Sequence, residues 1–220
     1  MTTALLVMAA IMAVIVGWLF KQTVNTQPWL AQSSVEAVQR GASSQTSVAI
    51  SLWVFLAVVT SMFSLFISAY YMRMSLADWK SLPEPGLLWF NTGVLVLTSA
   101  AMQWTLAAAK RGQSARLRNG LLVSGALTFA FLAGQLVVWQ QLTELGYFLT
   151  SNPANAFFYL LTALHALHLL GGLVVWGRTS IKVWRGVEVK KVQLSVALCT
   201  AYWHYLLLVW LILFALLLST

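Results

Sequence analysis

The chain has 220 residues, of which 60% are hydrophobic and only 8% are charged. Soluble domains contain about 25% charged residues, so this composition excludes an ordinary soluble protein and indicates a membrane protein. The net charge of +8 then belongs to loops that orient the chain in the membrane, and it does not indicate a nucleic-acid partner. The single cysteine, Cys199, excludes an internal disulfide framework and a thiolate metal cluster.

The apolar segments predict an all-α fold, a polytopic membrane helix bundle with six transmembrane helices. Runs of about 20 apolar residues are long enough to cross the hydrocarbon core of a bilayer. The predicted spans, in chain order, are residues 4–20, 48–72, 87–109, 120–142, 156–177 and 194–218. No Lys or Arg precedes the first run and no small-residue cleavage site follows it, so we expect a retained helix and not a cleaved signal peptide.

The segment between the first two spans is polar, and it divides the chain into two predicted regions. Residues 1–47 hold the N-terminal helix and this connector, and residues 48–220 form a five-helix domain. Small residues in the fourth and fifth spans are expected to let helix backbones approach closely. These residues are Gly125, Ala133–Gly134 and Gly171–Gly172.

The distribution of positive charge predicts the topology. Eleven of the thirteen Lys and Arg residues lie in the connector after the first span and in the loops after the third and fifth spans. Only Arg73 and Lys80 lie in loops on the opposite side. Because loops rich in Lys and Arg stay in the cytoplasm, we expect both termini to face the periplasm.

The acidic residues do not form a proton pathway within the predicted spans. All five, Glu36, Asp78, Glu84, Glu144 and Glu188, fall in loops or at span ends. Ion-coupled transporters and proton pumps usually carry ionisable groups at mid-membrane depth. This pattern argues against an autonomous pump or transporter.

Three histidines are the most distinctive polar residues in the spans. His165 and His168 are three residues apart, so they share one helix face, and His204 lies in the last span. Imidazoles bind Zn, Cu and Fe, so a metal site, or a haem held between His165 and His204, is one interpretation. The other is structural, with each neutral imidazole hydrogen-bonded to a neighbouring helix or a backbone carbonyl. Three histidines are too few for both the haems and the copper of a respiratory catalytic core, which favours the structural interpretation.

An ordered set of motifs carries a family resemblance. The motifs are "SLWVFLAVVTSMF", "LPEPGLLWFN", "FAFLAGQLVVWQQL", "LTALHALHLLGG" and "AYWHYLLLVWLILF". Together they cover roughly residues 50 to 216 and all five later spans. In this order they resemble subunit III of the haem–copper terminal oxidases, in its short bacterial form. The N-terminal span lies outside the resemblance.

The resemblance implies a non-catalytic subunit of a respiratory haem–copper oxygen reductase in a bacterial inner membrane. The complex would reduce O2 to water and pump protons. This chain would stabilise catalytic subunit I, bind phospholipid, and support proton uptake and turnover. Its expected partners are subunit I, subunit II, a small subunit IV as a further candidate, and membrane lipids. Haem and copper would belong to the partner subunits, with no cofactor or metal in this chain.

The resemblance also assigns expected roles to individual residues, none of them catalytic. His165, His168, His204 and Trp203 would be polar anchors between helices. Basic residues at the cytoplasmic ends of the spans are candidates for contacts with lipid headgroups. These residues are Arg111, Arg116, Arg118, Arg178 and Arg185.

The chain departs from the family pattern at three positions where the family often has an acid. Here these positions are Val59, Val138 and Leu207. Their apolar character argues against buried carboxylates handling protons in this subunit. It also leaves open a rival, the subunit III-like partner of a nitric oxide reductase. A more distant rival is a small haem-binding membrane cytochrome that uses His165 and His204.

Overall fold

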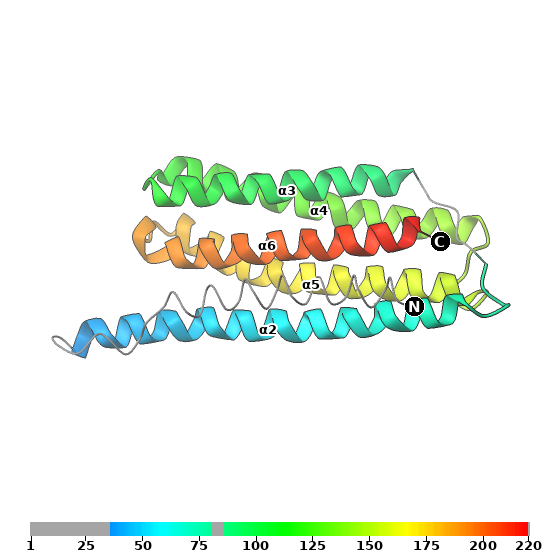
Figure 1. Cartoon of the computed structure of the whole chain (residues 1–220). Helices are drawn as coiled ribbons and strands as arrows, with labels where there is room; N and C mark the ends of the chain where they lie inside the picture. Colours follow the sequence, from blue (N-terminus) through cyan, green and yellow to red (C-terminus); the bar gives the residue numbers. More distant parts are fainter. Residues whose placement is uncertain (1–35, 81–85, 220) are drawn as a thin grey trace. The chain divides into compact units, whose positions relative to one another are not determined.

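The computed structural model describes residues 36–80 and 86–219, and within them it contains helices and turns only (Figure 1). The helices are α2 (Glu36–Met74), α3 (Leu87–Lys110), α4 (Ser114–Glu144), α5 (Pro153–Trp184) and α6 (Val189–Leu218). This confirms the predicted all-α class. The first predicted span, residues 4–20, lies outside the described residues, so a sixth helix and the periplasmic termini stay predictions.

The described residues hold five helices that are long and apolar enough to cross a membrane. Within α2, the span is Ser47–Met74, and α3 to α6 qualify over their whole lengths. These five spans match the later five predicted from the sequence. Several helices extend beyond the predicted runs, as at Ser114 and Val189, where α4 and α6 begin. Their first turns are polar, so hydropathy alone does not detect them.

Three of the connections between helices follow one pattern, in which a glycine with positive φ ends the helix. Gly112, Gly146 and Gly186 have φ values of 70°, 84° and 76°. After α3, the Gly112 amide donates to the Ala109 carbonyl (3.1 Å) and the next amide donates to the Ala108 carbonyl (3.0 Å). A side chain is disfavoured in this left-handed conformation. The glycines therefore mark where α3, α4 and α5 stop.

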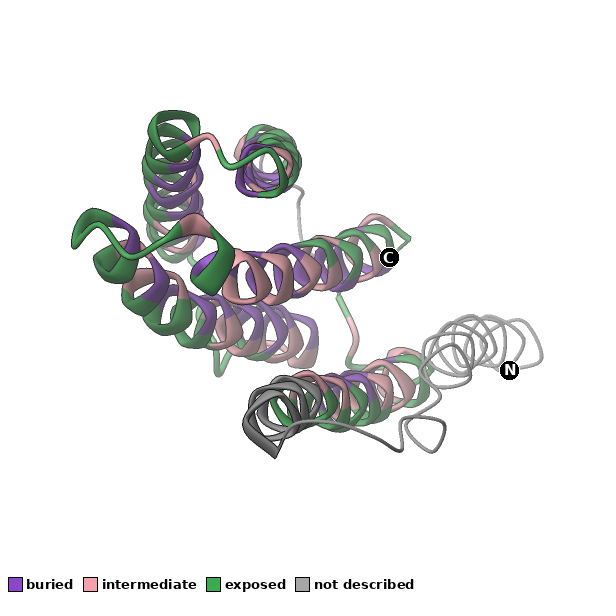
Figure 2. Cartoon of the chain, turned by 90° about the vertical axis from the view of Figure 1, so that its left-hand side faces the viewer, coloured by how far each residue is buried: buried purple, intermediate pink, exposed green. Residues whose placement is uncertain are grey.

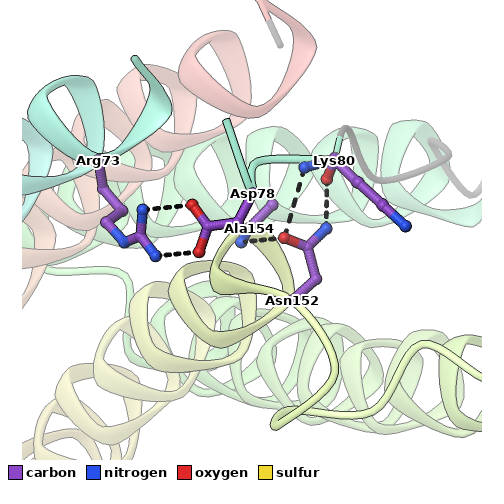
Figure 3. A network of polar contacts seen from close by, with 5 residues as sticks. All are labelled: Arg73, Asp78, Lys80, Asn152 and Ala154. Carbon is purple, nitrogen blue, oxygen red and sulfur yellow. Dashed lines mark hydrogen bonds and ion pairs between the residues drawn. The ribbon is translucent and has the colours of Figure 1, made fainter. Parts of the chain in front are cut away.

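The N-terminus of α5 is fastened to the segment before α3 by one side chain (Figure 3). Asn152 caps α5, because its Oδ1 accepts a hydrogen bond from the Ala154 amide (3.2 Å). The same amide side chain bonds the backbone of Lys80 through both its oxygen and its nitrogen. Nearby, Arg73 donates two hydrogen bonds to the carboxylate of Asp78. The Asn152 bonds hold Lys80 against the start of α5, and the ion pair braces the segment between Arg73 and Asp78.

The chain divides into two compact units, residues 1–72 and 73–220. Within the second unit, α3 and α5 each pack against both α4 and α6, which makes a four-helix bundle. Its buried residues concentrate on the sides of the helices that face one another (Figure 2).

Glycines mark the closest approaches in this bundle, as predicted for three of the small residues. A Cβ on Gly125 would overlap the Trp176 ring, and a Cβ on Gly134 would overlap the Asn91 side chain. A Cβ on Gly172 would meet the Tyr202 ring at 2.6 Å. Gly171 differs from its neighbour, because no atom lies within 4 Å of its Cβ position.

Candidate functional site

His204 binds α3 through both of its ring nitrogens. It lies at the middle of α6, and its ring shares one hydrogen bond with the Ser99 hydroxyl through Nδ1. Its Nε2 lies 3.2 Å from Oε1 of Gln103. These contacts fit the tautomer with the proton on Nε2, which donates to Gln103 while the Ser99 hydroxyl donates to Nδ1. The ring therefore links α6 to α3.

His168 makes its hydrogen bond within its own helix. Its Nδ1 donates to the Leu164 carbonyl at 2.7 Å, one turn earlier in α5. A link between helices at this position is made by the Tyr202 hydroxyl of α6, which donates to the His168 backbone carbonyl (2.9 Å). The motif "YWH" thus joins α6 to α5 through the tyrosine.

His165 is completely buried and lies between aromatic rings from two other helices. Its ring centroid is 5.9 Å from that of Phe131 in α4 and 5.1 Å from that of Trp210 in α6. Phe131 and Trp210 also contact each other edge to face at 5.0 Å. Among the residues that the structure describes, neither ring nitrogen of His165 has a hydrogen-bond partner.

Three tryptophans of the bundle each donate an indole N–H to a threonine hydroxyl of another helix. Trp203 donates to Thr128 (3.2 Å). Trp210 donates to Thr92 at 2.9 Å, and Trp139 donates to Thr162 at 3.1 Å. Each threonine also bonds a carbonyl one turn earlier in its own helix. Such bonds hold the aromatic rings in fixed orientations inside an apolar interior.

The sequence predicted Trp203 and the histidines but not the residues that bind them. Ser99 directly follows Thr98, and Thr128 is a single hydroxyl between apolar residues. Their only signal is their polarity, and nothing local shows which helix they face.

The three positions that lack the family acid are apolar and lie within helices. Val138 is fully buried in α4, one residue before Trp139, and Val59 is buried in α2. Leu207 of α6 is partly buried. These three positions therefore supply no ionisable group.

The five predicted headgroup-binding arginines are exposed. They lie around the turn between α3 and α4 and at the C-terminal end of α5. Arg111 and Arg185 cap the C-termini of α3 and α5. Arg116 and Arg118 lie in the first turns of α4, and Arg178 lies near the end of α5. Because α3 to α6 are antiparallel neighbours, all five lie toward one end of the bundle.

The described residues do not bring the histidines together as metal ligands. Among residues 36–80 and 86–219, no group of three or more His, Cys, Asp or Glu side chains is close enough to hold a metal ion. His204 uses both ring nitrogens toward α3, whereas His165 is enclosed by Phe131 and Trp210. The two rings thus contact different neighbours in the bundle.

Comparison with known proteins shows the family. No protein-family model matches the chain. A cytochrome c oxidase subunit 3 from Synechocystis sp. is 30% identical over 171 residues, which are 74% of this chain and 71% of the relative. The chain belongs to the cytochrome c oxidase subunit III family.

Other relatives support the same family. The subunit 3 of Thermostichus vulcanus is 33% identical over 132 residues, which are 58% of this chain and 62% of the relative. A haem–copper oxidase subunit I+III from Aeropyrum pernix is 26% identical over 210 residues, which are 90% of this chain and 25% of that longer protein. The chain is thus a haem–copper oxidase subunit III and a membrane protein, as its motifs and apolar helices predicted.

Proposed function

We propose that this chain is the non-catalytic third subunit of a respiratory haem–copper oxygen reductase in a bacterial inner membrane. The complex would reduce O2 to water and pump protons, with its haem and copper in the partner subunits. The observation that carries the proposal is the match to oxidase subunit III over 74% of the chain. The Aeropyrum pernix relative, which is named as subunits I and III together, supports subunit I as the direct partner. Subunit II and a small subunit IV complete the proposed complex.

In this proposal the chain stabilises subunit I as a rigid helical scaffold. His204 and Trp203 bond to α3 and α4 of the same bundle, which supports their role as polar anchors between helices. His168 bonds its own helix, and its backbone carbonyl accepts from Tyr202. His165 fills the space between two aromatic rings. All four residues would act on stability and not on electron transfer.

The same proposal includes phospholipid binding by the exposed arginines at one end of the bundle. Guanidinium groups bind phosphates well because they present several N–H donors in a fixed plane. The arginines concerned are Arg111, Arg116, Arg118, Arg178 and Arg185. Replacing all five with glutamine is expected to reduce the phospholipid that copurifies, as measured by mass spectrometry of the extracted lipids.

The decisive experiment is purification through a tag on this chain, followed by identification of the copurifying subunits. The same sample is assayed for oxygen and nitric oxide reduction. The expected result is a haem–copper subunit I with oxygen uptake. A matched preparation that lacks this chain should lose activity faster during turnover and take up protons more slowly. Recovery of the chain alone, or equal turnover lifetimes of the two preparations, would contradict the proposal.

A second candidate is the subunit III-like partner of a nitric oxide reductase. The observation that favours it is the apolar character of Val59, Val138 and Leu207, because a partner that does not pump protons needs no buried acids. The purification distinguishes the two candidates, since a nitric oxide reductase core without oxygen uptake would select this one. In either complex, a carbodiimide that modifies buried acids should not label these three positions.

A further inference from the structure

Three fully buried amide or imidazole side chains in the four-helix bundle have no hydrogen-bond partner among the described residues. They are Asn91 of α3, Gln135 of α4 and His165 of α5, which are 0%, 2% and 0% exposed. Both side-chain polar atoms of each residue are unpaired in this way. Buried polar atoms in native proteins nearly always have a partner in the protein or in ordered water. The missing hydrogen-bond partners of these three residues therefore require an explanation.

The three residues lie at one level of the bundle, which we call a layer. Asn91 is next to Thr92, which bonds Trp210, and Trp210 contacts His165. Asn91 also packs against Gly134, the residue before Gln135. The layer thus joins α3, α4 and α5, with Trp210 of α6 in contact with it.

Helix periodicity places Gln135 on the side of α4 that contacts α5. One turn before it, Phe131 contacts the His165 ring. One turn after it, Trp139 donates to Thr162, which lies one turn before His165. Residues four apart share a helix face, so Gln135 is directed at α5 between Thr162 and His165.

We propose that Asn91, Gln135 and His165 form a binding site for internal water. The ligand must be small, because all three side chains are buried and the rings of Phe131 and Trp210 pack against His165 and against each other. It must both donate and accept hydrogen bonds, because each amide offers N–H donors and an oxygen acceptor and a neutral imidazole offers one of each. It must be uncharged, because none of the three side chains supplies a formal charge to balance an ion. Water meets all three conditions and commonly bridges such buried groups.

The site is tested on the full-length chain in detergent by X-ray hydroxyl-radical footprinting. Radicals formed from a bound internal water oxidise the side chains around it, even when bulk solvent does not reach them. Trp210, which is 0% exposed and contacts His165, should be oxidised several-fold faster than Trp203. Trp203 is the matched control, because it is 1% exposed, lies two turns earlier in α6 and bonds to Thr128.

A variant assigns the oxidation to this site. Gln135→Met keeps the length of the side chain and removes its hydrogen-bonding atoms, so Trp210 oxidation should fall toward the level of Trp203. The helical circular dichroism and the melting temperature of the variant show whether it is folded. If the variant does not fold, the comparison of Trp210 with Trp203 in the unchanged chain remains the test. Equal protection of the two tryptophans in the unchanged chain would overturn the proposal, as would undiminished Trp210 oxidation in a folded Gln135→Met variant.

Discussion

Two adjacent glycines in α5 provide a matched test of how tightly the bundle is packed. Gly172 is buried, and an added Cβ would lie 2.6 Å from Cε1 of Tyr202 and 3.2 Å from Cη2 of Trp203. Gly171 is exposed, and its Cβ position has no atom within 4 Å. The two substitutions Gly172→Ala and Gly171→Ala make the same chemical change in the same helix. They differ only in what the added methyl group meets.

The magnitude follows from the constraints on the two rings. The Tyr202 hydroxyl is bonded to the His168 carbonyl (2.9 Å), and the Trp203 indole is bonded to Thr128 (3.2 Å). Neither ring can move without straining a hydrogen bond. Overpacking of this kind costs about 1–3 kcal/mol. Alanine is better than glycine in a helix interior by about 0.5–1 kcal/mol, a gain that both variants share, so Gly172→Ala should be less stable than Gly171→Ala by about 1–3 kcal/mol.

The assay is unfolding of the full-length chain in mixed micelles with increasing SDS, followed by helical circular dichroism. The unchanged chain gives the reference free energy of unfolding. We expect Gly171→Ala to equal or exceed it and Gly172→Ala to fall below Gly171→Ala. Equal free energies for the two variants would refute the close contact between α5 and the two rings.

Three further outcomes are expected from the same preparation. Thr128→Val removes the acceptor for Trp203 and should lower the free energy of unfolding by about 0.6–1.7 kcal/mol; an unchanged value would mean that this bond does not stabilise the bundle. The hydrogen bonds from Arg73 lower the pKa of the Asp78 carboxyl group. The pair therefore stabilises the fold at pH values above the ordinary carboxyl pKa of about 3.9. This stabilisation is lost as the pH falls through the lowered pKa. Asp78→Asn should therefore reduce the loss of stability in acid titration, and an identical pH profile would contradict the ion pair. Asn152→Ala removes the cap of α5, so it should lower the free energy of unfolding by about 0.5–2 kcal/mol and speed amide exchange in the first turn of α5. Asn152→Asp keeps the capping oxygen and should lose less stability. Equal losses in the two variants would argue against the cap.

The five described spans could be predicted from the sequence because their signals are local. A run of apolar residues identifies a span wherever the rest of the chain lies. The turn glycine Gly112 acts through its own backbone conformation, and Asn152 caps α5 through a side-chain bond to an amide only two residues ahead. The predicted spans were nevertheless shorter than α4, α5 and α6, because the helices continue into polar residues beyond the apolar runs.

The arrangement of the polar side chains could not be predicted in the same way. His204 and Ser99 are 105 residues apart, and their hydrogen bond exists only because α6 packs beside α3. The sequence placed His165 and His168 on one helix face but did not show what each contacts. In the structure His165 packs between aromatic rings, and His168 bonds the Leu164 carbonyl of its own helix.

Hydropathy and helix-ending signals belong to single segments of the chain, so each can be recognised without knowing how the rest of the chain folds. Hydrogen bonds between helices depend on the rotation and depth of each helix against its neighbours, and these are properties of the packed bundle. The family and the five described spans therefore follow from the order of the residues. The partners of His204, and the layer formed by Asn91, Gln135 and His165, follow from the way in which close contacts such as that of Gly134 with Asn91 bring the helices together.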